Sequence, residues 1–242
     1  MTERRVCLVT GGARRVGAAI VRDRAQRGDA VVIHHGSSPR EAAALAAEVE
    51  ALGSPALVVQ ADLADPNAPA RIVEHTMATF GRLDIVVSSA SLMTRHSFDA
   101  VTVAEWDEVE AVNLRAPFFL MQAAARVMRE GGVLIQLSDH LATETGFPQL
   151  IPHQVTKAAV TQLVATLAVE LAPRLRVNAV APGLVLPPDD MTDTALAAFL
   201  RDVPLQRAGT PRDVAEAIHF LIEATYITGV VLAVDGGRAL RR

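Results

Sequence analysis

The sequence predicts an α/β fold, a doubly wound parallel sheet of seven strands with helices on both faces. Short apolar segments alternate with helical segments along the whole chain, which is the pattern of such a sheet. Half of the 242 residues are hydrophobic, enough for a large core, but only 4% are aromatic. Small aliphatic side chains must therefore fill the space between the sheet and its helices.

The predicted strands are short apolar runs, and each is separated from the next by a longer helical stretch. We expect strands at Val6–Val9, Ala30–His34, Ala56–Gln60, Leu83–Val87, Val133–Leu137, Leu175–Val180 and Val230–Val234. We expect helices at Val16–Arg27, Arg40–Leu52, Ala68–Phe80, Ala104–Arg129, Pro152–Leu171 and Pro211–Glu223, and a short one near Thr194–Leu200. Glycine follows the ends of two of these helices, at Gly81 and Gly131, as is common. Neither a repeat nor a linker interrupts this order, so residues 1–242 are expected to form one domain.

The stretch Val6–Ala19, which reads V-C-L-V-T-G-G-A-R-R-V-G-A-A, predicts a phosphate-binding turn between the first strand and the first helix. A helix that begins directly after a strand points its free N–H groups into the crevice above the sheet, and two arginines add positive charge there. Ala13 stands at the second glycine of the G-x-G-x-x-G pattern, so a turn without a ligand is the alternative. The residues expected to bind a dinucleotide here are Thr10, Gly11, Arg14, Arg15, Val16 and Gly17.

The residues after the second strand indicate which dinucleotide binds. An acidic side chain here would hold a ribose 2′-hydroxyl and repel a 2′-phosphate, but H-H-G-S-S-P-R contains no carboxylate before Glu41. Ser37 and Ser38 can donate hydrogen bonds, and Arg40 supplies positive charge. We therefore expect NADP(H) rather than NAD(H), with an ordinary polar loop as the alternative.

Further ligand contacts are expected where other strands end, because ligands of doubly wound sheets bind beyond the carboxyl ends of the strands. After the third strand, Asp62 is expected either to accept a hydrogen bond from an adenine amino group or to cap a turn. The small residues after the fourth strand leave room for a flat ring, and they would equally suit close packing of a helix on the sheet. The remaining cofactor contacts expected on this basis are Leu63, Ser89, Ala90, Pro182 and Gly183.

Four polar residues form a candidate group for proton transfer. Asp139 ends the fifth strand, where a carboxylate can hold a proton or orient a substrate. His153 and Lys157 are four residues apart on one predicted helix and therefore share a face. Asn113 lies on a partly apolar helical stretch and should have a defined hydrogen-bond partner. The alternatives are an exposed helical lysine at 157 and an ordinary internal hydrogen bond at 113.

Over its whole length the chain resembles the short-chain dehydrogenase/reductase family. The resemblance rests on T-G-G-A-R-R-V-G (10–17), A-D-L (61–63), Asn113, T-K-A-A-V (156–160), R-V-N-A-V-A-P-G (176–183) and Y-I-T-G-V…V-D-G-G (226–237). Arg15 in the turn, Asp139 in place of the usual serine and the ending D-G-G-R-A-L-R resemble the pteridine reductase and dihydromonapterin reductase branch. That branch reduces pterins with NADPH in the cytosol, usually as a tetramer.

The resemblance implies a Rossmann-like fold and specific roles for several residues. Lys157 would bond the nicotinamide ribose and so belongs to both the catalytic and the cofactor residues, and Asn113 would hold a water in the proton relay. Arg15 would lie against cofactor phosphate and substrate. The residues expected to contact the substrate are Arg15, Ser91, Met93 and Leu184.

Three positions depart from the family pattern. His153 stands where the family has its tyrosine, four residues before the lysine, and the only tyrosine of the chain is Tyr226. Ser89 replaces the usual asparagine after the fourth strand. Met93 replaces an aromatic residue that stacks on the pterin in this branch, and its sulfur makes a weaker platform.

Three function classes follow from these residues. The first is an NADPH-dependent reductase of a pterin-like C=N bond or of a carbonyl. In it, Asp139, protonated or relaying through water, delivers the proton, and His153 orients the substrate or relays. The second is a catalytically impaired NADP(H)-binding protein, a sensor or scaffold, because the tyrosine is lost. The third, a metal hydrolase, is disfavoured because the seven histidines lack ligand spacing, and no metal site is expected.

Two larger features are expected around the site. The segment 184–204 is expected to be a lid that closes over the substrate and excludes water, with an ordinary surface loop as the alternative. The two long helices, 104–129 and 152–171, carry apolar residues on more than one face, whereas a sheet covers only one stripe of each. This surplus indicates a helix-mediated subunit interface, and the resemblance implies a homotetramer.

Composition and charge exclude several other partners. The formal net charge of −4 argues against nucleic acid and anionic membranes. Apolar runs stay below the ~20 residues that a membrane span needs, and no signal peptide is expected because the N-terminus leads directly into a core strand. Cys7 is the only cysteine, which excludes a disulfide within one chain and favours the reducing cytoplasm.

Overall fold

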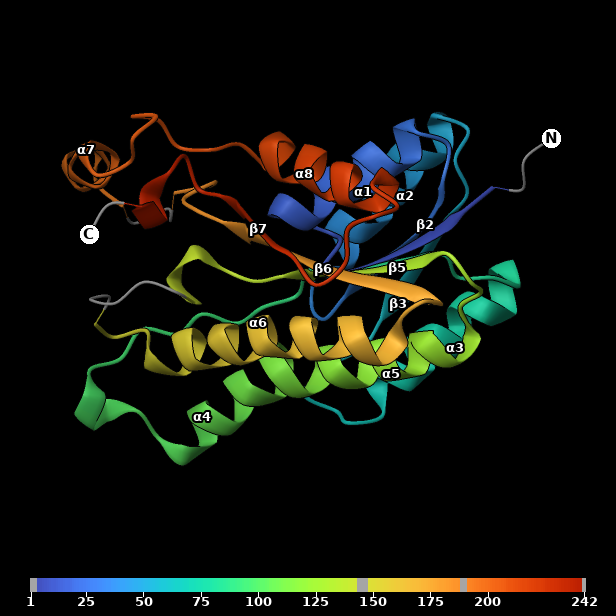
Figure 1. The fold of residues 1–242 in the computed structure, drawn as a ribbon, viewed down its shortest axis with the longest axis horizontal. Coiled ribbons are helices and arrows are strands. Elements are labelled where there is room, and N and C mark those ends of the chain that lie inside the picture. The colour runs from blue at the N-terminus through green and yellow to red at the C-terminus, as the bar shows by residue number, and fades with distance from the viewer. Residues whose placement is uncertain (1–3, 143–147, 188–190, 241–242) are drawn as a thin grey trace.

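The computed structural model describes residues 4–142, 148–187 and 191–240, which form a sheet of seven parallel strands flanked by helices (Figure 1). The strand order is β3-β2-β1-β4-β5-β6-β7, and every neighbouring pair is parallel. The chain winds outward in both directions from β1 and β4, so a crevice opens at the carboxyl ends of these two central strands. The predicted doubly wound fold is confirmed.

The elements follow the predicted alternation closely. The strands are β1 (Val6–Thr10), β2 (Ala30–His35), β3 (Ala56–Gln60), β4 (Ile85–Ser88), β5 (Gly132–Leu137), β6 (Leu175–Pro182) and β7 (Val231–Val234). The α-helices are α1 (Arg15–Gln26), α2 (Pro39–Ala51), α3 (Ala68–Phe80), α4 (Val103–Glu110), α5 (Ala116–Val127), α6 (Ile151–Leu171), α7 (Asp193–Arg201) and α8 (Pro211–Glu223). The short 3₁₀ segments are Phe98–Ala100, His140–Ala142 and Arg238–Leu240.

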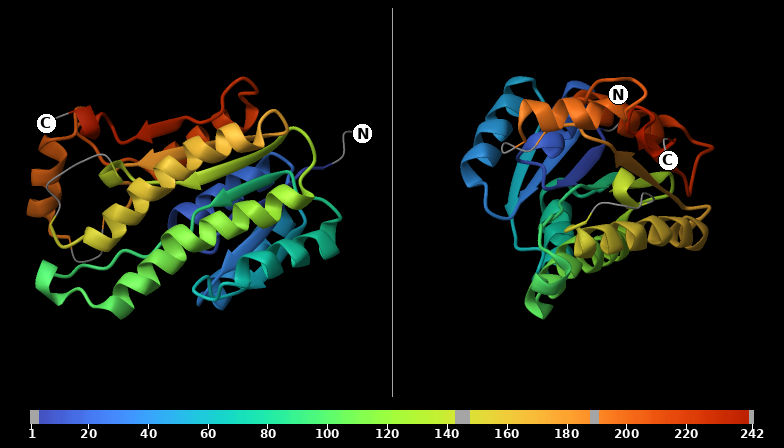
Figure 2. Two further views of the ribbon diagram at one scale, coloured as in Figure 1. Left: turned by 60° about the horizontal axis from the view of Figure 1, so that its bottom comes forward. Right: turned by 90° about the vertical axis from the view of Figure 1, so that its left-hand side faces the viewer.

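Two apolar cores lie on the two faces of the sheet, because successive side chains of a strand point to opposite faces. In β1, Cys7 and Val9 contribute to the core under α1, α2 and α8, whereas Val6 and Leu8 contribute to the core under α3, α5 and α6. Figure 2 shows the same three layers from two other directions. Since both faces are covered, the central strands are buried throughout, as expected for strands that read as continuous apolar runs.

The predicted long helix 104–129 is divided into three parts. A π-helical turn, Ala111–Arg115, separates α4 from α5, and Asn113 lies in its middle. Pro117 explains the interruption, because a proline has no N–H to donate to the carbonyl of residue 113 in an α-helical ladder. Turns of this type often occur at functional sites, and this one turns Asn113 toward the end of β4.

The predicted lid, 184–204, follows the end of β6, and within it Pro188, Asp189 and Asp190 lie outside the described residues. Its helix, α7, buries none of its residues and lies at one end of the molecule, near the C-terminus (Figure 1). At its far end Val203 is buried, and the N–H of Leu205 donates to the carbonyl of Gly236 at 3.1 Å. Among the described helices, none combines the length and the apolar character needed to cross a membrane.

A substitution in the first turn of α1 tests how closely this helix packs against the glycine turn. A Cβ on Gly17 would lie 2.1 Å from the carbonyl oxygen of Gly11, so helix and turn are in direct backbone contact. Gly17→Ala would gain about 1 kcal/mol of helix propensity, but the backbone overlap costs more, about 1–3 kcal/mol or above. We expect a net loss of stability in urea unfolding. Gly36→Ala is the control, because its Cβ would meet only the Ala61 carbonyl oxygen at 3.8 Å. A Gly17→Ala protein as stable as the wild type would contradict this packing.

Candidate active site

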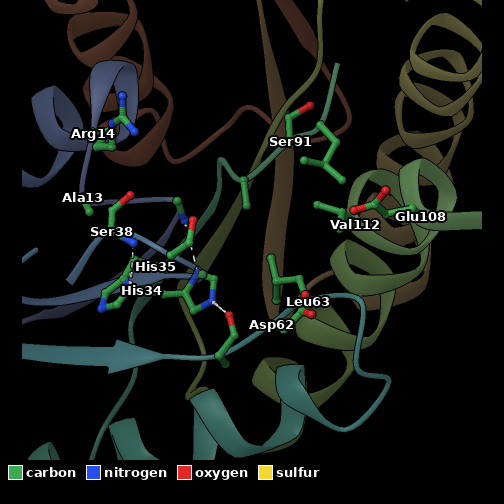
Figure 3. A pocket seen from close by; sticks show the side chains of 16 residues that line it. Ala13, Arg14, His34, His35, Ser38, Asp62, Leu63, Ser91, Glu108 and Val112 are labelled. Atoms are coloured by element: carbon green, nitrogen blue, oxygen red, sulfur yellow. Dashed lines mark hydrogen bonds between the residues drawn. The ribbon is translucent and has the colours of Figure 1, made fainter. Parts of the chain in front are cut away.

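A cavity of about 450 Å³ lies beyond the carboxyl ends of β1 to β4 (Figure 3). Eight of the predicted cofactor and substrate residues line it: Gly11, Arg14, Ser37, Ser38, Asp62, Leu63, Ala90 and Ser91. Eight further residues also line it: Ala13, His34, His35, Gly36, Ala61, Leu92, Glu108 and Val112. Predicted residues from the ends of several strands therefore line one continuous cavity.

The glycine turn offers backbone donors to this cavity. Gly11 has a φ of +62°, which favours glycine, and a Cβ there would lie 2.9 Å from the Cα of Ala90. The N-cap of α1 is Arg14, and no side chain of the described residues caps the first turn. Unpaired N–H groups at a helix start, beside an exposed arginine, form a site for an anion such as a phosphate.

Arg15, the other arginine of the turn, is held in an unusual conformation. Its φ of +51° lies in the left-handed region, where a side chain costs free energy that a glycine would not. Its Nη2 donates to the carbonyl of Leu186 at 3.0 Å. Arg15 therefore connects the glycine turn with the predicted lid segment, although Arg15 does not line the cavity itself.

The end of β2 has the polar character that the sequence predicts for a 2′-phosphate site. Ser37 and Ser38 line the cavity on the same side as Arg14, as Figure 3 shows for Arg14 and Ser38. The N–H of Ser38 donates to Nδ1 of the buried His35 at 3.3 Å, which fixes the loop. Arg40 is exposed on α2 and is not among the residues that line the cavity. Among the described residues that line the cavity, Arg14 therefore supplies the arginine charge on this side.

Thr10 and Asp62 hold backbone turns. The hydroxyl of Thr10 is buried and accepts from the N–H groups of Ser89 and Ala90, at 3.0 and 3.2 Å, so it joins the ends of β1 and β4. Asp62 lines the cavity, but its Oδ1 also accepts from the N–H of Ala64 at 2.9 Å. Asp62 therefore caps a turn, which is one of its two predicted roles. Because Asp62 also lines the cavity, its side chain can still contact a ligand there.

His34 lines the cavity, and its ring contacts the backbone of two neighbouring segments. His34 was not identified as a site residue from the sequence. Its Nδ1 accepts from the N–H of Gly11 at 3.2 Å, and its Nε2 lies 3.0 Å from the carbonyl of Ala61 (Figure 3). Its own carbonyl accepts from Gly12. Burial lowers the pKa of His34 to about 4, and the hydrogen bond to Ala61 opposes the shift only in part. The ring is therefore neutral at pH 7, donating from Nε2 and accepting at Nδ1.

Asn113 and His153 both bind the main chain at Leu92, just after β4. The amide of Asn113 donates to the Leu92 carbonyl at 2.8 Å and accepts from the Leu92 N–H at 2.7 Å. It also donates to Thr156 and accepts from the Ser91 hydroxyl, both at 3.2 Å. Nδ1 of His153 lies 3.0 Å from the same Leu92 carbonyl. Asn113 has the defined partners that the sequence predicts, and they fix the loop that His153 contacts.

Asp139 lies between two imidazoles. Its Oδ2 is 3.1 Å from Nε2 of His153, and its Oδ1 is 2.9 Å from Nδ1 of His140. Oδ1 also accepts from the N–H of Leu141 at 2.9 Å. Burial disfavours the charged form, but the hydrogen bonds from His140 and His153 outweigh it and hold the pKa of Asp139 well below its ordinary value. Asp139 is therefore ionised near pH 7.

The partners of the two ring nitrogens of His153 indicate where the Asp139–His153 pair would carry a proton. One nitrogen of His153 faces a carbonyl oxygen and the other faces a carboxylate, and both of these groups only accept. With Asp139 ionised, each of these two acceptors is paired with the ring only if the nitrogen that faces it carries hydrogen. The side chain of His153 is 4% exposed and that of Asp139 is 22% exposed, so Asp139 is the more accessible member of the pair.

Lys157 lies one helical turn beyond His153 and is buried, so it is not the exposed helical lysine of the alternative interpretation. Its Nζ donates to the carbonyl of Leu137, the last residue of β5, at 2.9 Å. Burial lowers the pKa of Lys157 to about 8, and the nearby Asp139 carboxylate opposes this shift. A buried ammonium with donors to spare is suited to bind polar oxygens of a ligand.

The remaining predicted residues lie near the site without lining the cavity. Val16 and Gly17 are in the first turn of α1, and Ser89 follows β4. Pro182 ends β6, and Gly183 approaches Asp235 so closely that a Cβ would lie 2.8 Å from its Cα. Leu184 is half-buried, whereas Met93 is 48% exposed. Met93 is therefore available to a ligand but has no fixed position against one.

Besides His34, the sequence interpretation missed Glu108, and it gave no role to Leu92 or His140, although both follow strand ends where ligand contacts were expected. His140 directly follows Asp139 at a strand end, and that position was the available signal. Leu92 makes its hydrogen bonds to Asn113 and His153 through backbone atoms, and Glu108 faces the cavity from α4 beside Val112 (Figure 3), so neither has a signal in residue type. In the part of the chain that the structure describes, no three His, Cys, Asp or Glu side chains are grouped to hold a metal ion.

Comparison with known proteins gives relatives over nearly the whole chain. A family model described as enoyl-(acyl carrier protein) reductase matches residues 11–239. Versicolorin reductase 1 of Aspergillus parasiticus is 36% identical, with 96% of this chain and 95% of that protein covered. A short-chain dehydrogenase from Burkholderia cenocepacia, solved with NADP, is 36% identical with a TM-score of 0.92, and 97% of each chain is covered. FolM alternative dihydrofolate reductase 1 from Brucella canis, also with NADP, is 34% identical with a TM-score of 0.92, covering 98% of this chain and 94% of that one.

Because His34 is buried as a neutral ring, we expect the free energy of unfolding to fall at acidic pH. Its pKa is about 4 in the folded chain and 6.5 as the ordinary value, so the unfolded state binds more protons between these values. Stability is fully present above pH 6.5 and is lost as the pH falls toward 4, by up to about 3 kcal/mol. We expect urea unfolding to show this loss in the wild type and a smaller one in His34→Gln, which keeps an acceptor but does not titrate. Parallel stability curves for the two proteins would contradict the role of His34.

Proposed function

The chain belongs to the short-chain dehydrogenase/reductase family, and on that premise we propose that it is an NADPH-dependent reductase of a pterin-like C=N bond or of a carbonyl. The observation that carries the proposal is the 3.1 Å contact between Nε2 of His153 and Oδ2 of Asp139, because His153 stands where the resemblance places the family's tyrosine. Asp139 follows the carboxyl end of β5, and His153 lies in the first turn of α6.

The described residues fit a phosphorylated dinucleotide. Gly11 has no side chain to block the approach of a pyrophosphate to the α1 N-terminus, and Arg14, Ser37 and Ser38 offer charge and donors to a 2′-phosphate. The loop after β2 has no carboxylate before Glu41 that would repel this phosphate. The cofactor bound by two structural relatives is NADP, which agrees with this donor set.

NADPH, when bound, supplies the hydride, and the chain must supply the proton. We place that proton at rest on Nε2 of His153, from which it reaches the substrate through Asp139, the more exposed of the two. The low pKa of Asp139 disfavours one of the two sequence hypotheses, a carboxyl that is itself protonated at rest, and it favours a relay. The two residues act as one acid with a shared proton.

Lys157 keeps the role that the family resemblance implies, whereas Asn113 acts in this proposal as a positioning residue for the pair rather than as the holder of a relay water. The Lys157 ammonium is fixed by the Leu137 carbonyl and presents its remaining hydrogens to a nicotinamide ribose. Asn113 holds the Leu92 carbonyl, which in turn holds His153. The substrate would enter beside Ser91, Met93 and Leu184, with Arg15 at the mouth.

A pterin-like substrate is favoured by chemistry as well as by resemblance. An imidazolium is in general a stronger acid than a phenol, so it is suited to protonate the weakly basic nitrogen of a C=N bond. One structural relative is named a dihydrofolate reductase, and dihydrofolate contains such a C=N bond. Reduction of an activated carbonyl is the second substrate class to test.

We also propose a cytoplasmic homotetramer. Large apolar side chains on α5 and α6 face outward, with Phe119 40%, Val155 48% and Val169 80% exposed. A second copy of the chain would cover them and provide the interface that the apolar surplus of these helices predicts. The single cysteine, Cys7, is buried, which suits a reducing compartment. Light scattering of the purified protein should give four times the chain mass of 25.7 kDa, and a monomer would contradict the proposal.

Turnover of NADPH tests the proposed reaction. We expect the wild type to oxidise NADPH in the presence of 7,8-dihydrobiopterin or, as a carbonyl probe, 9,10-phenanthrenequinone. Asp139→Asn and His153→Gln should each lower kcat at least about 100-fold, because each removes the shared proton. NADPH affinity, measured by fluorescence titration, should stay within about threefold in both, since neither residue lines the cavity.

The control is Asp107→Asn, which changes an exposed carboxylate on α4 and should leave kcat unchanged. Equal rates in the wild type and in both site variants would exclude the pair as the proton source. Tight NADPH binding with no turnover of any probe would instead support the alternative function, a binding protein. In that case His153→Tyr, which installs the family's side chain, should gain turnover that the wild type lacks.

A further inference from the structure

His140 connects the proton-holding pair with the helix of the predicted lid. Its ring is buried and its Nδ1 lies 2.9 Å from Oδ1 of Asp139 and 3.0 Å from the carbonyl of Pro182. Both of these groups accept, so Nδ1 carries hydrogen and is shared between them. One side chain thus joins the end of β5, which carries Asp139, to the end of β6, from which the lid segment departs.

The other side of the His140 ring contacts α7. The rings of His140 and Phe199 meet edge to face, with centroids 6.4 Å apart and planes at 85°. The guanidinium of Arg238 lies over the same Phe199 ring, 5.3 Å from its centroid, and Nη1 of Arg238 is 3.6 Å from the Asp202 carboxylate. Phe199 is therefore held between the C-terminal segment and His140.

α7 has few other contacts that would fix it to the body. None of its residues is buried, and the firmly packed residue near it is Val203, after the helix has ended. A helix that is anchored at one end and has no fully buried residue can change its position at low cost in free energy. The His140–Phe199 contact is then the place where a movement of α7 would be transmitted to Asp139.

We propose that His140 is a positioning residue that couples the lid helix to proton delivery. It holds Asp139 in line with His153 when Phe199 packs against its ring, and it releases Asp139 when α7 moves away. Proton delivery is then favoured when the lid lies over a substrate and disfavoured when the site is open. This inference rests on the proposed function of the Asp139–His153 pair.

Two substitutions of His140 separate its two contacts. His140→Asn keeps a side-chain N–H near Asp139 but loses the ring that meets Phe199, whereas His140→Phe keeps a ring but loses the donor. Phe199→Leu removes the aromatic edge from the lid side. Phe220→Leu is the matched control, because Phe220 is 53% exposed on α8, which covers a different part of the sheet.

The measurement is kcat, KM and the pH profile of kcat with NADPH and 7,8-dihydrobiopterin in these variants. Phe199→Leu should lower kcat about tenfold and shift the pH profile, and His140→Phe should do the same. In the His140→Asn background Phe199→Leu should have no further effect on kcat, because contacting residues are not additive. The charged and titratable groups around Asp139 that set this profile are His140, His153 and Lys157, with Arg238 and Asp202 beyond Phe199.

Two kinetic outcomes would overturn the inference. The first is a Phe199→Leu protein in which only KM changes, as for an ordinary substrate contact. The second is an equal loss of kcat from Phe199→Leu in the wild type and in the His140→Asn background, because the effect would then bypass the His140 ring.

A wild type without turnover would count against the proposed function rather than against the role of His140. In that case the ¹⁵N chemical shifts of the His153 ring measure the coupling between α7 and the Asp139–His153 pair. Phe199→Leu should change these shifts in the wild type but not in the His140→Asn background. Phe220→Leu should leave them unchanged. Shifts that stay the same in Phe199→Leu would overturn the coupling.

Discussion

The site depends on one constraint, namely that the ring of His153 lies between two groups that can only accept hydrogen bonds. The Leu92 carbonyl faces one nitrogen and the Asp139 carboxylate faces the other. A buried imidazole in this position is satisfied only if both nitrogens carry hydrogen, because an unpaired buried acceptor costs about 1–3 kcal/mol. The proposed reductase would hold its proton here, where the family resemblance leads one to expect a tyrosine hydroxyl.

The loop after β4 connects this constraint with the cavity beyond the carboxyl ends of β1 to β4. Thr10 binds the N–H groups at the start of the loop, and Asn113 binds both backbone groups of Leu92 two residues later. The glycine turn lies on one side of the loop and the Asp139–His153 pair on the other. A ligand that fills the cavity along Ala90 and Leu92 would thus contact the same segment that fixes His153.

Much of this arrangement could be predicted from the sequence, because apolar periodicity determines the strands and the strands determine where ligands bind. The positions of Gly11, Ser37, Asp62 and Asp139 at strand ends followed from that rule alone. Hydrogen-bond partners did not follow, since they depend on which backbone groups the tertiary fold brings close. His34 illustrates the point, because nothing in its neighbourhood in the sequence shows that its ring will accept from Gly11. The π-turn at 111–115 shows the same limit, because the periodicity of 104–129 predicts helix throughout and does not reveal how Pro117 interrupts the ladder.

The most direct test is the protonation state of the His153 ring in the ligand-free protein near pH 7. The ¹⁵N chemical shifts of its two nitrogens, assigned by their absence in His153→Gln, distinguish a protonated nitrogen from a bare one. Two nitrogens that both carry hydrogen are the predicted result. A bare nitrogen facing either Leu92 or Asp139 would contradict the account of a stored proton.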